Sequence, residues 1–148
     1  MPALLINPQF EKNVSSQRII TDISVMKKNL GIEDYDFTIV IEDNAFIHRF
    51  NKKYLGIDAP TDVLAFPANE INPESKRTYL GDILISFPIA KKQADDLKHD
   101  IFEELMILIV HGLLHLLGYD HKKENEKKKM FSLQYQTLKK TKIPFPIE

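Results

Sequence analysis

Three histidines at regular spacing are the residues of this chain whose types and positions most favour chemistry. His111 and His115 are four residues apart, so both imidazoles lie on one face of a helix and can reach one ion. Gly118 can end that helix and let His121 approach from outside it as a third ligand. Three nitrogen ligands leave one position of a zinc ion open, as in catalytic sites. The spacing therefore predicts one Zn²⁺ ion per chain, held by His111, His115 and His121 and used for hydrolysis.

A packing role for these histidines, and metals other than zinc, stay open at this point. Any one of the three, taken alone, is more simply read as a core residue hydrogen-bonded to backbone, and only the joint spacing favours ligation. The chain contains no cysteine, so the ligands must be nitrogen or oxygen atoms. Three imidazoles also suit Ni²⁺, Co²⁺ or Cu²⁺. His48 and His99 lack such spacing, and we expect both at the surface.

The pattern His-x-x-x-His-x-x-Gly-x-x-His resembles the zinc-binding signature of metzincin proteases, and it predicts a metzincin-like active-site helix. Those proteases carry a glutamate directly after the first histidine as the general base, and here that residue is Gly112. A peptidase that lacks this base is disfavoured. A metal hydrolase of another substrate class remains an alternative.

Carboxylates near the expected strand ends could assist a metal site. Asp120 follows a Gly-Tyr turn and precedes the third histidine, so it could orient an imidazole or simply form the turn. Asp62 and Asp82 could orient a ligand or cap an element. Thr61 is a weaker candidate, as a hydrogen-bond donor to phosphate. The candidate catalytic residues are His111, Asp120, Asp62 and Thr61.

The elements that must position these residues follow from periodicity and turn signals. Runs of β-branched and apolar residues predict strands at residues 3–6, 37–41, 61–66 and 80–86. Helical spacing predicts helices at about residues 15–30, 45–55, 89–98, 100–117 and 122–140. Residues 67–78, with two prolines, predict a loop. The sequence thus predicts an α+β fold, a single domain over residues 1–148 with a mixed four-stranded sheet and about five helices.

Composition limits the possible partners. Apolar and charged fractions of 43% and 28% are those of an ordinary globular domain, and a net charge of −1 gives no global attraction to nucleic acid. RNA contact would need a local patch, for which the candidates are Lys122, Lys123, Lys127, Lys128 and Lys129. The longest apolar stretch, residues 105–117, is too short to cross a bilayer. We expect no membrane association, a cytoplasmic location and a monomer, with the oligomeric state left open.

Residues 111–121 resemble the His-Gly-x-Leu-His-Leu-x-Gly-Tyr-Asp-His signature of the YbeY family, the endoribonucleases and rRNA maturation factors. Residues 58–67 and 80–83 resemble two further segments of that family, so the resemblance spans most of the chain. It implies an α+β domain, a zinc ion on three histidines, and cleavage of single-stranded rRNA in 16S rRNA 3′ maturation and ribosome quality control. The implied partners are the ribosome or ribosomal proteins. The attacking group, water or the RNA 2′-OH, stays open.

One position departs from the family pattern. Leu55 follows Tyr54, where the family usually has arginine. Arg49 or Lys53, on the same predicted helix, could supply the missing charge. If neither does, the alternative function is a non-catalytic ribosome-associated factor with a structural metal.

Overall fold

The computed structural model describes residues 3–119 and 124–140, and the structural statements below concern those ranges. The elements are β1 (Ala3–Ile6), η1 (Pro8–Asn13, a 3₁₀ helix), α1 (Ser16–Leu30), β2 (Tyr35–Glu42), α2 (Asn44–Leu55), β3 (Val63–Ile71), β4 (Thr78–Ser86), α3 (Phe87–Leu97), α4 (Ile101–Leu116) and α5 (Glu124–Lys140). The sheet has the order β1-β2-β4-β3; β1, β2 and β4 are parallel, and β3 is antiparallel to β4. The predicted α+β fold with a mixed four-stranded sheet is confirmed.

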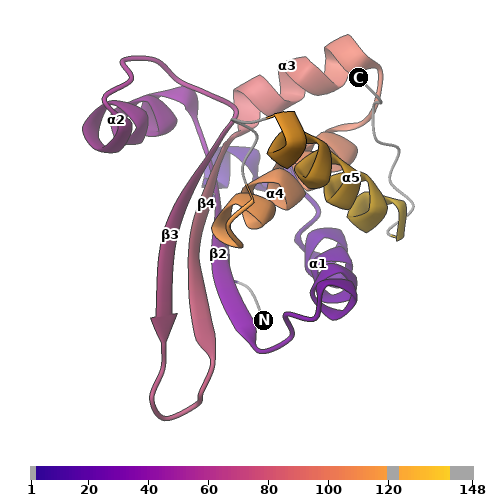
Figure 1. Cartoon of the computed structure of the whole chain (residues 1–148). Helices are drawn as coiled ribbons and strands as arrows, with labels where there is room; N and C mark the ends of the chain where they lie inside the picture. Colours follow the sequence, from indigo (N-terminus) through magenta and orange to yellow (C-terminus); the bar gives the residue numbers. More distant parts are fainter. Residues whose placement is uncertain (1–2, 120–123, 141–148) are drawn as a thin grey trace.

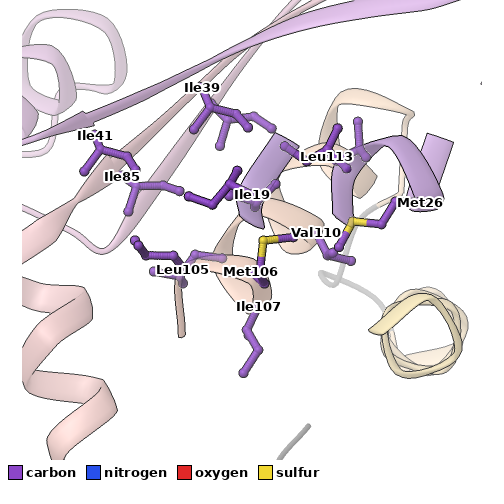
Figure 2. Close-up of a cluster of buried hydrophobic side chains, with 14 of the residues drawn as sticks. Ile19, Met26, Ile39, Ile41, Ile85, Leu105, Met106, Ile107, Val110 and Leu113 are labelled. Carbon is purple, nitrogen blue, oxygen red and sulfur yellow. The ribbon is translucent and has the colours of Figure 1, made fainter. Parts of the chain in front are cut away.

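One face of the sheet carries most of the hydrophobic core. Ile39 and Ile41 of β2 and Ile85 of β4 point from this face toward α4 (Figure 2). Helices α1, α4 and α5 gather on the same side (Figure 1). Twelve of the sixteen residues of α4 are buried, which explains why its sequence is apolar on nearly all sides. No helix within the described ranges is long and apolar enough to cross a membrane.

The opposite face of the sheet is covered by α2 (Figure 1). Ile47 packs there on Leu64 and Leu84, which are paired across β3 and β4 and therefore point to the same face. The rings of Phe46 and Phe50 stack with centroids 4.7 Å apart. The next ring along the helix, that of Tyr54, lies 5.5 Å from Phe50. Helix α2 therefore packs on the sheet through Ile47, Phe46 and Phe50, and Tyr54 extends the row of rings toward the surface.

A capping side chain and a glycine mark the two ends of α4, the helix that carries two of the candidate ligands. Asp100 precedes its first turn, and its Oδ1 accepts the backbone N–H of Glu103 at 2.8 Å. The helix ends at Leu116, and Gly118 follows with φ of +100°, a conformation that glycine adopts without strain. Gly118 therefore follows the helix end as the sequence predicted.

The prediction of a loop over residues 67–78 is wrong for half of its length, because only residues 72–77 lie outside the strands. β3 continues through Pro67 to Ile71, and the β3–β4 hairpin extends well beyond the other strands (Figure 1). Pro67 is tolerated because β3 is an edge strand. It pairs with Gly81, where a Cβ would lie 2.1 Å from the carbonyl oxygen of Phe66, so only glycine fits. The sequence also did not predict the 3₁₀ helix Pro8–Asn13.

Candidate functional site

Two of the predicted ligands face one another on the last turns of α4. The Nε2 atoms of His111 and His115 are 3.2 Å apart, and the ring planes are inclined by 74°. Both side chains are half-buried. The Nδ1 atom of His111 lies 3.0 Å from Oε1 of Gln134 on α5, a residue that is 2% exposed. One helix therefore brings the imidazoles together, and a second helix contacts one of them.

The third predicted ligand lies outside the described residues. His121 and Asp120 both fall in the range 120–123, as do two of the candidate lysines. Within residues 3–119 and 124–140, no group of three histidine or carboxylate side chains converges on one point. The described part of the chain thus supplies two of the three expected nitrogen ligands.

A cavity of about 930 Å³ opens beside His111. Its walls come from the start of β3 and from α3, α4 and α5, and they include Asp62, Gln93, Asp96, Glu104, His111, Lys127, Phe131, Gln134 and Tyr135. Three of these side chains are carboxylic acids and one is a lysine, so the lining is acidic where it is charged. Two aromatic rings of α5 supply the flat apolar part of the wall.

Asp62 is brought to the same cavity as His111. Its Oδ1 accepts the backbone N–H of Val63 at 2.7 Å and the hydroxyl of Thr61 at 3.3 Å. Its Oδ2 accepts from the side-chain amide of Gln93 at 3.3 Å. Three donors hold this carboxylate in place. Thr61 is not a cavity-lining residue and reaches the site through its bond to Asp62.

Asp82 does not support the candidate site. It pairs with Phe66, which packs in the α2-side cluster, so Asp82 points to the α2 face of the sheet and away from His111 and His115. There its carboxylate accepts a short hydrogen bond from the hydroxyl of Tyr79. Burial and this bond raise the pKa of the Tyr79 phenol. The suggestion that Asp82 orients a ligand imidazole is therefore wrong for His111 and His115, the two ligands that the structure describes.

His99 is another correction, because its side chain is only 10% exposed. Its Nε2 lies 2.7 Å from Oε1 of Glu104, a carboxyl on the first turns of α4 that also lines the cavity. Burial raises the pKa of Glu104, and the hydrogen bond with His99 opposes that rise. His99 is therefore not a surface residue as expected, and its contact with Glu104 is a buried structural one. His48 fits its surface prediction better, with a side chain 42% exposed.

Gly112, directly after the first histidine, packs against the sheet. A Cβ at this position would lie 2.7 Å from Cγ2 of Ile83 on β4. A glutamate here would collide with the core. Any side chain at this position would have to displace Ile83, so the packing of α4 on β4 disfavours a metzincin-type glutamate base here.

The positions around Leu55 lie away from the cavity. Leu55 is 53% exposed at the end of α2, and neither Arg49 nor Lys53 is a cavity-lining residue. The guanidinium carbon of Arg49 lies 5.8 Å from the ring centre of Phe46, and the Lys53 ammonium lies 5.2 Å from the ring of Tyr54. Within the described residues, nothing brings either cation to His111.

Sequence reasoning missed Gln134, Gln93 and Glu104 as members of the site. The sequence could have predicted a buried Gln134, because it lies four residues after Met130 and four before Leu138, in the middle of a buried helical stripe. A buried glutamine requires a hydrogen-bond partner. Glu104 gives a similar signal, since it interrupts the apolar face of α4 seven residues before His111.

Fold and site together define an α+β protein in which a buried helix presents two facing imidazoles beside a cavity. The family model for endoribonuclease YbeY matches residues 6–142. The endoribonuclease YbeY of Persephonella marina is 38% identical over 136 residues, covering 90% of this chain and 89% of its own. That of Pelotomaculum thermopropionicum is 40% identical over 147 residues, covering 93% and 95%. The chain therefore belongs to the YbeY family, and this membership supports an endoribonuclease role.

A solved structure shares the fold of this chain. The solution structure of TM1509 from Thermotoga maritima matches this chain with a TM-score of 0.67 at 26% identity. The match covers 95% of this chain and 88% of that one. The similarity thus extends over the whole α+β fold and is not confined to the histidine motif.

Proposed function

We propose that this chain is a metal-dependent endoribonuclease that cleaves single-stranded RNA, with one Zn²⁺ ion held by His111, His115 and His121. The observation that carries the proposal is the 3.2 Å separation of the two Nε2 atoms beside the cavity. Two nitrogens that each lie 2.0–2.1 Å from a tetrahedral zinc ion are about 3.4 Å apart. The described imidazole pair therefore fits two adjacent ligand positions. Ni²⁺ or another divalent ion would fit the same nitrogen ligands.

The chain's own residues would prepare the substrate for attack. When bound, the ion would supply Lewis-acid stabilisation for the negative charge that develops on the scissile phosphate. Asp62 presents a carboxylate fixed by three hydrogen bonds, and its role would be to accept the proton of the attacking hydroxyl, from water or from the RNA 2′-OH. Thr61 would act through Asp62, as a positioning residue. Asp120, the residue before His121 in the sequence, would orient a ligand imidazole.

The residues of α5 that line the cavity favour a single-stranded RNA substrate, whose bases are unpaired. Phe131 and Tyr135 are one helical turn apart and both line the cavity, so each ring could stack on an unpaired base. Lys127 precedes Phe131 by one turn on the same wall and could contact a phosphate. Lys128 and Lys129 are exposed nearby. A duplex, whose bases are stacked on one another, could not use the two rings.

We further propose ribosomal RNA as the substrate, in 16S rRNA 3′ maturation and ribosome quality control in the cytoplasm. The support is the resemblance of residues 58–67 and 111–121 to the corresponding family segments, together with membership of the family. The ribosome or ribosomal proteins would then be the partners of a monomeric chain.

A second candidate function is favoured by one observation. Leu55 stands where the family usually has arginine, and neither Arg49 nor Lys53 lines the cavity. A chain without that cation could bind the ribosome with a structural metal and cleave nothing. A peptidase, in contrast, is disfavoured, because Gly112 packs against Ile83 and leaves no room for the glutamate base.

The test is cleavage of labelled single-stranded and double-stranded rRNA fragments by the purified full chain. We expect cleavage of the single-stranded fragment, loss of cleavage after chelation, and recovery when Zn²⁺ is restored. Ribosome binding without cleavage under any metal would favour the non-catalytic factor. Hydrolysis of casein would instead return the peptidase to consideration. The product ends would identify the nucleophile, because attack by the 2′-OH leaves a cyclic phosphate.

A further inference from the structure

We propose that Gln134 of α5 is a positioning residue for the imidazole pair. Its side-chain carbonyl accepts the Nδ1–H of His111 and so keeps the Nε2 lone pair of that ring directed at His115. Where it concerns metal binding, this inference rests on the proposed function. Where it concerns the state of the ring, it stands on the hydrogen bond alone.

The hydrogen bond joins two elements that are distant in the sequence. Nδ1 of His111 lies 3.0 Å from Oε1 of Gln134, and the two residues are 23 positions apart, on α4 and α5. Gln134 is 2% exposed. Leaving a buried polar side chain without its hydrogen-bond partner is unfavourable, so this contact strongly prefers to stay formed.

The identity of the acceptor decides the tautomer of the ring. A neutral imidazole carries one proton, and a carbonyl oxygen can only accept a hydrogen bond. With Oε1 of Gln134 facing Nδ1, the proton must be on Nδ1 and the lone pair on Nε2. Nε2 is the atom that lies 3.2 Å from the Nε2 of His115. The opposite amide orientation would place the ring proton on Nε2 and block ligation through that atom.

Helix α5 holds Gln134 firmly in place. Met130 and Leu138, one turn before and one turn after it, are both 0% exposed and belong to the main core. Thr137 is buried beside them, and its hydroxyl donates to the carbonyl oxygen of Leu133 at 2.7 Å. A group that must fix a ligand ring within a few tenths of an ångström is best carried by such a packed element. α5 therefore does more than cover α4.

Three variants separate the hydrogen bond from the packing. Gln134→Met keeps the length of the side chain and removes the acceptor, whereas Gln134→Glu keeps an acceptor. Gln136→Met is the matched control, because Gln136 is an exposed glutamine on the same helix. The first readout is the tautomer of His111 in the metal-free full chain, from nitrogen-15 NMR at a pH where the ring is neutral. We expect the Nδ1–H form in the wild type, the control and Gln134→Glu, and a shift toward the Nε2–H form in Gln134→Met.

Finding the Nε2–H form in the wild type would overturn the proposal, even if no variant folds. An unchanged tautomer in folded Gln134→Met would do the same. The second readout is Zn²⁺ affinity by competition with a chelator, where we expect a loss of about 10–100-fold in Gln134→Met, and wild-type or tighter binding in Gln134→Glu. Equal affinity in the wild type and Gln134→Met would contradict the role of Gln134 at the metal. If the wild type binds no metal, the proposed function fails, and the NMR readout still decides the role of Gln134.

Discussion

Helix α4 carries two histidine contacts, one near each end, and they differ in what faces the imidazole. At the start of the helix, His99 faces the carboxyl of Glu104 at 2.7 Å. At the end, His111 faces a second imidazole, that of His115, at 3.2 Å. A carboxyl and an imidazole satisfy one another by sharing a proton. Two neutral imidazoles that face each other through Nε2 can form at most one such bond, and a cation between them would use both lone pairs.

The group that faces each imidazole distinguishes His99, which is structural, from His111 and His115, which are candidates for metal binding. Burial alone does not separate them, because the side chains at both ends of α4 are partly or largely buried. Glu104 satisfies His99 within the fold, whereas the facing nitrogens of His111 and His115 are the pair that we propose to hold an ion.

The largest expected effect contrasts His115→Ala with His99→Ala. Loss of a ligand should lower RNA cleavage by more than about 100-fold, beyond the range typical of an outer partner of a metal ligand. His99→Ala should leave cleavage within a few-fold of wild type, yet lower the free energy of unfolding by about 1–3 kcal/mol, because Glu104 loses its partner. Cleavage rates and urea unfolding measure the two effects. Similar losses of cleavage in both variants would contradict the distinction between a structural His99 and a metal-binding His115.

A smaller effect, on the free energy of unfolding, is expected from a substitution at Gly112, which lies between the two ends of α4. In Gly112→Ala the new Cβ would lie 2.7 Å from Cγ2 of Ile83, so either the β4 side chain or α4 must move. We expect a loss of about 1–3 kcal/mol in the free energy of unfolding, as for other overpacked cores. Thermal or urea unfolding gives the value. An unchanged stability would show that α4 is less tightly packed on the sheet than the structure indicates.

The pH dependence of stability tests only the His99–Glu104 contact at the start of α4. Burial raises the pKa of Glu104 in the folded state, so the folded chain holds this proton more tightly than the unfolded chain. The stability that the proton provides is complete below the ordinary glutamate pKa and is lost as pH rises through the raised value. Glu104→Gln should therefore gain stability relative to wild type over that interval, by about 1.4 kcal/mol per pKa unit. Urea unfolding at several pH values measures this difference, and a constant difference would contradict the raised pKa.

The smallest effect is expected from Lys127→Ala. This lysine of α5 lines the same cavity as Glu104 and His111 of α4, and we proposed that it contacts a phosphate of the RNA. Removing one phosphate contact from a single strand should lower the slope of log affinity against log salt by about 0.7. Binding of a labelled RNA strand at increasing salt gives the slope. A slope equal to that of wild type would show that RNA does not contact this wall through Lys127.

The sequence predicted the fold class and most of the element bounds, because they depend on local patterns. Ser15 and Gly31 bound α1 as a cap and a left-handed terminator, and Asp43 caps α2. The strand through Pro67 was missed, because only the order of the strands shows that β3 is an edge where proline is tolerated.

The site was predicted only in part, for a similar reason. The four-residue spacing of His111 and His115 is local, and the structure brings their Nε2 atoms together. The partners Gln134 and Gln93 come from other helices, and no local pattern specifies such contacts. His99 was expected at the surface because it lacks the spacing of a metal ligand, and its burial follows from the turn between α3 and α4.

Metal binding by the histidine pair is tested most directly by the metal content and Zn²⁺ affinity of three purified full-length chains: wild type, His115→Ala and His48→Ala. His48 is the matched control, since its Nε2 lies 2.6 Å from Asp58, away from the cavity-lining residues. We predict about one ion per chain in the wild type and in His48→Ala, and none retained by His115→Ala. A wild type without bound metal, or equal metal content in His115→Ala, would contradict a metal site on these histidines.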